Sequence, residues 1–402
     1  MEKQTIRDID LKKKRVLIRV DFNVPLNEQF QITDDARIVK SLDTIRYCLG
    51  EQAKVILMSH LGRPNGKPEP QFSLKPVAEH LSKLLNQRIE LLPDCVGPVV
   101  ESKVKSVGEG QAVLLENLRF HPEEEKNDPE FSKKLASLGE VFVNDAFGAA
   151  HRAHASTVGV TKHLPSVAGF LLAREVEYFD KAITNPERPF MTILGGAKVS
   201  DKIKLISNLL DKADAILVGG AMAYTFYKVM GIKIGNSKFE PAGENAAREA
   251  LEKAKAKKIP FLLPTDRVIA EKFEKGAANK IVTGDIPDGW MGLDIGPETV
   301  QKYKEVLAKA KTIVWNGPVG VFELPPFDRG TRELAEFIAT LKATTIIGGG
   351  DTAAAVKIFG LENKMSHVST GGGASLEYLE GTVLPGVAAL VDKKETVGSR
   401  KA

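Results

Sequence analysis

Short apolar runs alternate with amphipathic stretches over most of the chain. Residues 15–20 (RVLIRV) form the first such run, and its length and β-branched content predict a strand. The same strand-like pattern recurs at residues 54–58, 112–115, 140–143, 191–194, 215–218, 312–315 and 344–347. Because strands that alternate with helices usually form parallel sheets covered on both faces, this order predicts an α/β fold.

One helix after the first strand has apolar side chains at the spacing of a single face: Ile38, Leu42, Ile45 and Leu49. Asp34 or Asp35 is placed to cap its amino end by accepting a first-turn amide hydrogen. Gly50 follows the last periodic residue, and glycine readily adopts the left-handed conformation that ends a helix. We therefore predict that a left-handed Gly50 ends this helix.

A domain boundary is expected at residues 170–190. The amphipathic stretch 171–183 predicts a helix, and residues 184–189 (TNPERP) contain prolines, which stop helix and sheet alike. We therefore expect two doubly wound, Rossmann-like parallel-sheet domains joined by a helical hinge. The predicted domains are residues 1–172 and 189–385, with the interdomain helix and linker at 173–188. The polar residues 393–402 are expected to fray.

Composition narrows the class of protein without identifying it. The chain has 402 residues and a formal net charge of only +4, which disfavours nucleic acid as a partner. The first residues lack an apolar signal core, and no apolar run reaches the roughly 18 to 20 residues that span a bilayer. We therefore expect a cytoplasmic protein with no membrane partner. Its two cysteines, Cys48 and Cys95, fit a reducing compartment and are expected to be inert packing residues.

Ligands of open α/β sheets bind beyond the carboxyl ends of the strands, so the residues after each apolar run are informative. In the first half these are Asp21, Asn23, His60, Arg63, Arg119, Asn144, Asp145, His151, Arg152 and His154. Arginine forks hold carboxylate and phosphate, and Asp and Asn bind hydroxyls, so the set suits a small, multiply charged anion with hydroxyls. Taken singly, each residue is more often a surface ion pair or a core histidine. Their shared position after strands favours the anion site.

Glycines take the corresponding positions in the second half, at residues 195–196, 219–220, 317, 348–350 and 371–373. Glycine lets a backbone approach phosphate oxygens closely and point amide hydrogens at them. A tight strand-to-helix turn explains any one of these positions, but the set predicts a nucleotide site. Lys198 and Lys202 lie four positions apart near a helix start and can both face one phosphate chain, although a solvated pair has the same spacing.

Asp351 follows three glycines and precedes Thr352 at a predicted helix start. It can cap that helix as its N-cap residue. It can also supply a hard oxygen ligand to a magnesium ion that bridges nucleotide phosphates, and the two roles can coexist. Asp351 is therefore the candidate metal ligand.

Two familiar nucleotide-binding motifs fit the sequence poorly. The P-loop pattern does not occur in the chain. Gly348, Gly350 and Ala353 match the loose dinucleotide fingerprint, but the next strand ends in Thr370 and not in an acidic residue for a ribose. An NAD-dependent dehydrogenase is therefore a disfavoured alternative.

Residues 19–25 (RVDFNVP) resemble the signature of the phosphoglycerate kinase family, and the resemblance extends to about residue 394. Further blocks similar to that family are residues 59–64, 116–120, 151–156, 195–202, 289–294, 315–323, 348–352 and 370–375. The resemblance therefore covers nearly the whole chain, and no known block is missing from it.

This resemblance implies roles for individual residues. The acid substrate would bind Asp21, Asn23, Arg37, His60, Leu61, Gly62, Arg63, Arg119 and Arg152. The nucleotide would bind Gly196, Ala197, Lys202, Gly219, Gly220, Gly292, Leu293, Asn316, Glu323, Gly349, Gly350, Asp351 and Thr352, with Asp351 at the metal. The catalytic residues, which would contact the phosphoryl group during its transfer, would be Arg37, Lys198, Gly372 and Gly373. Arg37 comes from the resemblance alone, because its place just inside a helix is typical of a solvated residue.

The resemblance also implies the reaction: reversible phosphoryl transfer between 1,3-bisphosphoglycerate and ADP, giving 3-phosphoglycerate and ATP, in glycolysis and gluconeogenesis. Mg²⁺ would accompany the nucleotide, and the enzyme would be a monomer that closes about its hinge. We expect direct in-line transfer without a phosphoenzyme, because positioning and positive charge are what this reaction requires. A carboxylate acceptor needs no general base, so His60, His151 and His154 need not move protons.

Two further expectations follow from the resemblance. The C-terminal segment of the family folds back onto the first domain, which implies the same for residues 386–402, although 395–402 run past the usual end. A catalytically inactive nucleotide-binding scaffold is an alternative to the kinase and would be expected to lack Arg37, Lys198 or Asp351. All three residues are present, so this alternative is disfavoured.

Overall fold

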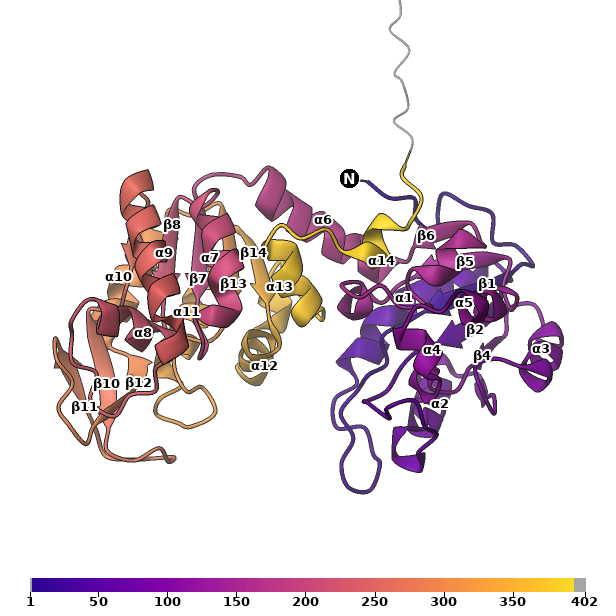
Figure 1. Ribbon diagram of the computed structural model, residues 1–402, viewed down its shortest axis with the longest axis horizontal. Helices are drawn as coiled ribbons and strands as arrows, with labels where there is room; N and C mark the ends of the chain where they lie inside the picture. The colour runs from indigo at the N-terminus through magenta and orange to yellow at the C-terminus, as the bar shows by residue number, and fades with distance from the viewer. Residues whose placement is uncertain (1, 394–402) are drawn as a thin grey trace, which may run out of the picture. The chain divides into compact units, whose positions relative to one another are not determined.

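The computed structural model describes residues 2–393, which belong to two compact units (Figure 1). The first unit contains the chain up to Glu177 together with residues from Val383 onward, and the second contains residues 178–382. Each unit has its own six-stranded parallel sheet with helices, so the predicted α/β class with two Rossmann-like sheets is confirmed. Within residues 2–393, every helix is too short or too polar to cross a bilayer.

The sheet of the first unit has the order β3-β4-β2-β1-β5-β6. Its strands are β1 (Arg15–Arg19), β2 (Lys54–Met58), β3 (Glu90–Leu91), β4 (Ala112–Leu114), β5 (Val141–Asn144) and β6 (Ser166–Ala168). Its helices are α1 (Ala36–Gly50), α2 (Lys75–Leu85), α3 (Pro98–Lys105), α4 (Pro122–Glu125), α5 (Pro129–Ala136) and α14 (Pro385–Ala388). Val16, Leu17 and Ile18 of β1 are fully buried, as expected of a central parallel strand covered on both faces.

The parallel sheet of the second unit has the order β15-β14-β13-β7-β8-β9. Its strands are β7 (Phe190–Leu194), β8 (Ala215–Val218), β9 (Phe261–Leu262), β13 (Thr312–Asn316), β14 (Thr344–Gly348) and β15 (His367–Val368). Its helices are α7 (Ile203–Leu210), α8 (Met222–Val229), α9 (Glu244–Lys257), α10 (Pro297–Leu307), α11 (Arg329–Ile338), α12 (Gly350–Ile358) and α13 (Gly373–Leu379). Trp315 of β13 is fully buried in a core that includes Tyr303 of α10 and Leu334 of α11.

A small antiparallel sheet in the second unit was not predicted. It has the order β11-β10-β12 and consists of β10 (Asp266–Ala270), β11 (Asn279–Thr283) and β12 (Met291–Ile295). The outer strand β11 is almost wholly exposed, so its sequence lacks the apolar run by which the other strands were recognised. This sheet places residues 291–295 beside the glycine-rich edge of the parallel sheet.

Two predicted helix ends differ from the structure. Helix α1 runs through Gly50, and the left-handed residue beyond it is Gln52, so the prediction of a left-handed Gly50 was wrong. At its amino end Asp35 is the N-cap residue but makes no capping bond; its carboxylate pairs with His80, and Asp34 accepts from the Ala36 amide. The N-cap of α12 is Gly349, which places Asp351 inside the first turn and not at the cap.

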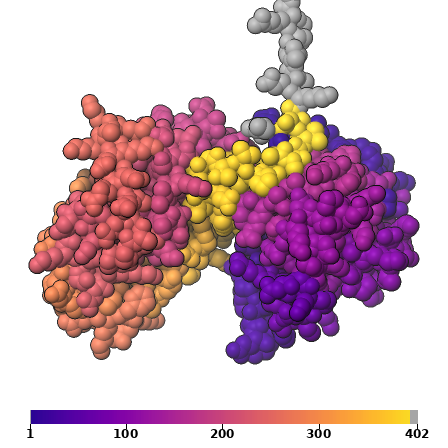
Figure 2. Space-filling view, viewed as in Figure 1, coloured from indigo at the N-terminus to yellow at the C-terminus, as the bar shows by residue number. Residues whose placement is uncertain are grey.

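Helix α6 (Phe170–Thr184) carries the chain from the first unit into the second. The chain returns to the first unit from Val383 onward, and Figure 2 shows part of the yellow C-terminal stretch against the magenta residues of that unit. There the Gly386 amide donates to the Ala150 carbonyl at 2.8 Å, and Asn144 donates to the Gly386 carbonyl at 3.1 Å. The predicted fraying and return of residues 394–402 lie outside the described part of the chain.

Candidate functional site

The strand order of the first sheet reverses at β1, which pairs with β2 on one side and β5 on the other. A crevice forms outside the strand ends at such a reversal, and it is the usual ligand site of open α/β sheets. Asp21 and Asn23 follow β1, and His60 follows β2. The fold therefore gathers these predicted acid-binding residues at one edge of the sheet.

Arg37 approaches this edge from the first turn of α1. Its guanidinium donates to both carboxylate oxygens of Asp21, at 3.1 Å each, and to the backbone oxygen of Asn23 at 3.2 Å. The Arg37 side chain is 32% exposed, so part of its fork stays open to a ligand. The structure thus explains why a helix residue that looks solvated in the sequence belongs beside the strand ends.

Hydrogen bonds tie the loop after β1 to the loops after β2 and β4. The Asn23 side chain accepts from the Gly62 amide at 2.8 Å, and the Gly62 carbonyl accepts from Arg119 at 2.9 Å. Asn117, which sequence reasoning did not single out, donates to the Leu61 carbonyl at 2.7 Å and accepts from the Arg119 amide at 3.0 Å. Asn117 therefore fixes the two loops that carry Gly62 and Arg119.

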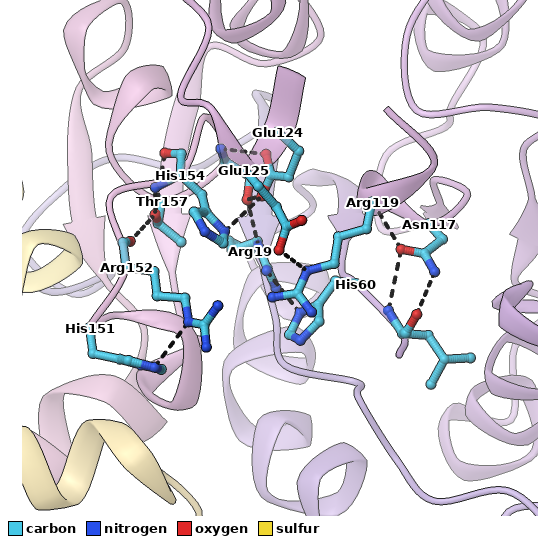
Figure 3. A network of polar contacts seen from close by, with 12 residues as sticks. Arg19, His60, Asn117, Arg119, Glu124, Glu125, His151, Arg152, His154 and Thr157 are labelled. Atoms are coloured by element: carbon cyan, nitrogen blue, oxygen red, sulfur yellow. Dashed lines mark hydrogen bonds and ion pairs between the residues drawn. The ribbon is translucent and has the colours of Figure 1, made fainter. Parts of the chain in front are cut away.

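A buried polar network lies beneath this edge (Figure 3). Arg19, the last residue of β1, donates to the Ser156 hydroxyl at 2.8 Å and to Nδ1 of His60 at 3.0 Å. Ser156 in turn donates to the buried carboxylate of Glu124. Because a guanidinium can only donate, Nδ1 of His60 must accept, and the neutral ring then carries its proton on Nε2. Sequence reasoning missed Arg19 and Glu124, although Arg19 opens the signature block.

Two histidines at this edge, His60 and His154, are held in the neutral form. Burial first, and then the charges of Arg19, Arg119 and Arg37, keep the pKa of His60 well below its usual range. Burial and the same kind of positive surroundings lower the pKa of His154 to about 4. Both rings are therefore uncharged at neutral pH and suit hydrogen bonding better than proton transfer.

Arg63 and Arg152 are exposed and complete the group of predicted acid-binding residues. Burial lowers the pKa of Arg119, and the positive charges of Arg152 and Arg63 lower it further. The negative charge of Glu125 acts in the opposite direction. The three guanidinium groups are thus close enough to repel one another. An anion would relieve that repulsion, so the cluster favours a multiply charged ligand.

The second sheet has its own reversal, between β7 and β13, and four neighbouring strands end there in glycine turns. A Cβ at Gly195 would lie 2.0 Å from the Pro318 carbonyl oxygen, so only glycine fits. Gly220 has φ +66°, and a Cβ there would lie 2.7 Å from the Gly196 amide nitrogen. These glycines are therefore required by the close approach of neighbouring turns.

The side chain of Lys202 spans this second reversal. Its ammonium donates to the Gly195 carbonyl at 2.6 Å and to the backbone and side-chain oxygens of Asn316 at 2.9 and 2.7 Å. Burial lowers the pKa of Lys202 to about 8, although the negative charges of Asp351 and Asp201 act to raise it. The mostly charged ammonium hydrogen-bonds only to neutral oxygens, and Asp351 and Asp201 compensate its charge without bonding to it, so the strand ends still favour a polyanion.

Two adjoining cavities open at this edge. The polar one, of about 320 Å³, contains Lys198, Asp201 and Lys202, and the other, of about 420 Å³, contains apolar side chains such as Met291 and Val321. Both volumes are within the usual range of small-ligand sites, about 300 to 1,000 Å³. The cavities are lined by these predicted nucleotide-site residues: Gly196, Ala197, Lys202, Gly220, Gly292, Leu293, Asn316, Glu323, Gly349, Gly350, Asp351 and Thr352.

Three predicted residues do not line these cavities. Gly219 lies behind Val319, because a Cβ there would be 2.5 Å from the Val319 side chain. Gly372 is the N-cap residue of α13, with φ +52°, and Gly373 is the first residue of that helix. Sequence reasoning missed Tyr224 of α8, which lines the larger cavity; an aromatic residue on an apolar helix face gives no signal that separates it from core.

Asp351 fits the magnesium ion that was predicted for it. Its carboxylate is exposed, sits in the first turn of α12 and lines both cavities. Mg²⁺ usually takes one or two protein carboxylates and completes its shell with water and phosphate oxygens. The exposed carboxylate of Asp351 beside a polar cavity, which Asp201 also lines, is consistent with that habit.

Crevices at the reversals of two α/β sheets, one rich in arginine and one in glycine and lysine, are suited to phosphate-bearing ligands, as a phosphotransferase requires. A family model described as phosphoglycerate kinase matches residues 6–382. The chain belongs to the phosphoglycerate kinase family, and it is accordingly an enzyme, a kinase of glycolysis that acts on small molecules.

The chain matches individual relatives over nearly its whole length. The chain is 56% identical over 400 residues to a phosphoglycerate kinase of Thermosipho africanus, covering 98% of this chain and 99% of the relative. It is 54% identical over 400 residues to that of Fervidobacterium nodosum, covering 98% and 100%. The solved phosphoglycerate kinase of Coxiella burnetii has a TM-score of 0.88 at 44% identity, covering 96% of this chain and 98% of that one.

Proposed function

We propose that the first unit binds 3-phosphoglycerate or 1,3-bisphosphoglycerate and that the second binds ADP or ATP with Mg²⁺. This division assigns the acid to the predicted domain 1–172 and the nucleotide to 189–385, with 173–188 as the hinge. The observation that carries the proposal is the ammonium of Lys202, held by neutral oxygens beside the polar cavity. We also propose a cytoplasmic monomer, in keeping with the low net charge and the two cysteines.

The acid site is proposed to work through charge and hydrogen bonding. Arg63, Arg119 and Arg152 hold the phosphate and carboxylate groups, because guanidinium forks match these anions. Asp21 and Asn23 bind the hydroxyl group of the acid. His60 donates through Nε2–H, since its Nδ1 accepts from Arg19. Leu61 and Gly62 shape the loop that carries these contacts.

The nucleotide site is proposed to divide between the two cavities. The base enters the larger cavity, where Gly292 and Leu293 form part of an apolar wall. Glu323, which is exposed at that cavity, accepts from the ribose hydroxyls. The phosphates lie in the polar cavity against the backbone of Gly196 and Gly350. The Thr352 hydroxyl donates to them, and Lys202 does so by exchanging one of its three bonds for a phosphate oxygen.

The transfer step is proposed to be direct and in line. Arg37, the exposed Lys198 and the amides of Gly372 and Gly373 surround the phosphoryl group as it moves between carboxylate and nucleotide. Asp351 holds Mg²⁺, which neutralises phosphate charge when bound. The neutral His60 and His154 support a mechanism without a proton shuttle, because the attacking carboxylate has no proton to lose.

A coupled assay with 3-phosphoglycerate, ATP and Mg²⁺ tests the proposal. We expect turnover in the parent, loss of nucleotide affinity in Lys202→Ala, and parental behaviour in Lys204→Ala, an exposed lysine that lines neither cavity. Calorimetric nucleotide binding without turnover would favour the inactive scaffold. Unchanged nucleotide affinity in Lys202→Ala would contradict the assignment of the polar cavity to the phosphates.

A further inference from the structure

A cluster of three different ligand types lies in the first unit, among residues with no part in the proposed reaction. Asp94 and Cys95 follow β3, and His121 immediately precedes α4. One carboxylate oxygen, the Cys95 sulfur and one imidazole nitrogen all lie within 4.8 Å of one another. Loops after β3 and before α4 thus meet at a point where a thiol, a carboxylate and an imidazole converge.

The geometry needs little change to hold a metal ion. Tetrahedral zinc with Zn–N and Zn–O distances of about 2.0 to 2.1 Å and Zn–S of about 2.3 Å requires ligand atoms roughly 3.3 to 3.8 Å apart. His121 Nε2 and Asp94 Oδ1 are 2.6 Å apart and joined by a hydrogen bond, so they would separate by under about 1 Å on binding. Side-chain rotations that change the separation of ligand atoms by at most about 1.5 Å reach the tetrahedral spacing.

The three side chains of the cluster differ in solvent exposure, and the difference suits the binding of an ion from solvent. The Cys95 thiol is fully buried, whereas the His121 and Asp94 side chains are 28% and 44% exposed. An ion can therefore reach the carboxylate and imidazole from water and contact the sulfur behind them. Water can supply the fourth ligand, as it does in sites with three protein ligands.

We propose that Asp94, Cys95 and His121 form a site for a zinc-like, thiol-binding divalent cation. The Cys95 thiol gives up its proton on coordination, and the proton of the hydrogen bond between His121 and Asp94 is displaced; both pass to solvent. A thiolate ligand selects Zn²⁺ or Co²⁺ over Mg²⁺, which prefers oxygen. The site is therefore chemically separate from the one assigned to Asp351, and it would give the buried Cys95 a role beyond packing.

The site is connected to the acid-binding edge. His121 lies two residues after Arg119, in the same short segment of chain, and the His121 amide donates to the Leu118 carbonyl. A metal ion that holds the His121 ring therefore restricts the turn that also carries Arg119. We expect Zn²⁺ at this site to raise the KM for 3-phosphoglycerate and to leave nucleotide affinity unchanged.

Cobalt titration of the full chain, without nucleotide and with excess Mg²⁺, tests the site directly. We expect one equivalent of Co²⁺ to bind with a thiolate-to-metal charge-transfer band in the near ultraviolet and to be displaced by Zn²⁺. Cys95→Ser should abolish the band, and His121→Gln should weaken Zn²⁺ binding at least about tenfold in competition with a chromophoric chelator. Circular dichroism confirms that each variant is folded.

The chain supplies two matched controls. Cys48→Ser removes the other buried cysteine. His80→Gln removes a histidine that is paired with a carboxylate, Asp35, at 2.9 Å but does not belong to the metal cluster. Both should keep the band and the parental affinity. No thiolate band in the parent, or a band that survives in Cys95→Ser, would overturn the proposal. Zn²⁺ affinity lost in His80→Gln but kept in His121→Gln would place the metal elsewhere.

Discussion

The carboxyl group of Asp145 is buried at the amino end of α6. Its Oδ1 accepts from the amides of Leu171 and Leu172, at 2.9 and 3.3 Å. Its Oδ2 is buried and makes no hydrogen bond of normal geometry with the described residues, although the Thr44 hydroxyl is near enough to act on the carboxyl. Burial, the largest influence, raises the pKa of Asp145 to about 7, although bonds from Thr44 and the two amides oppose it.

This shift predicts a pH dependence of stability. In the unfolded chain the carboxyl ionises near 3.8, whereas in the folded protein it keeps its proton up to about 7. Between these values the folded state binds the extra proton, so the free energy of unfolding falls as pH rises through the window. Between about pH 4.5 and pH 8, linkage with these two values gives a loss of about 3 kcal/mol from this one group.

Asp145→Asn tests the prediction, because asparagine resembles the protonated carboxyl and keeps Oδ1 as an acceptor. Urea unfolding followed by circular dichroism, fitted with a separate transition for each unit, gives the free energy of unfolding at each pH. Between about pH 4.5 and pH 8, the free energy of unfolding should fall by about 3 kcal/mol more in the parent than in the variant. Taking the difference between the two pH values cancels any constant effect of the substitution.

Glu79→Gln is the control, since it removes an exposed carboxylate from α2 that is not among the groups acting on Asp145. It should keep most of the parental pH dependence. A parallel pH dependence in Asp145→Asn and the parent would refute the reasoning, because the proton bound by the folded state would then belong to another group.

Four further predictions concern the reaction. Lys198→Ala should lower kcat about a hundredfold or more, equivalent to roughly 3 kcal/mol, with little loss of nucleotide affinity, whereas turnover within about threefold of the parent would remove Lys198 from the mechanism. Arg119→Ala should raise the KM for the acid and leave ATP binding by calorimetry intact; an equal loss of ATP affinity would contradict the division of labour. Asp351→Asn should shift the Mg²⁺ requirement to higher concentration, and a change in thermal stability alone would point to a structural role. The radius of gyration by small-angle scattering should fall most with 3-phosphoglycerate and a nonhydrolysable nucleotide together, and an unchanged value would count against closure about α6.

Local sequence patterns were sufficient for the central strands and for the glycine turns that follow them. Strands such as β1 and β13 are buried on both faces, so their apolar runs are continuous and easy to recognise. The antiparallel sheet was not predicted, because β11 is exposed and has no such apolar run. The end of α1 was misplaced because a glycine near a helix end is a common but not obligatory terminator, and here Gln52 takes the left-handed conformation.

The sequence by itself determined the α/β class, the residues at the strand ends and, through its motif blocks, the family. Only the tertiary structure decided how those residues act on one another. The Lys202 ammonium meets oxygens of Gly195 and Asn316 because β7 and β13 are neighbours in the sheet, although they are far apart in the chain. His60 is neutral because the fold buries it beside Arg19, and His121 meets Cys95 because two separate loops converge. Charge state and ligand geometry depend on burial and on non-local neighbours, and neither is written in any local stretch of sequence.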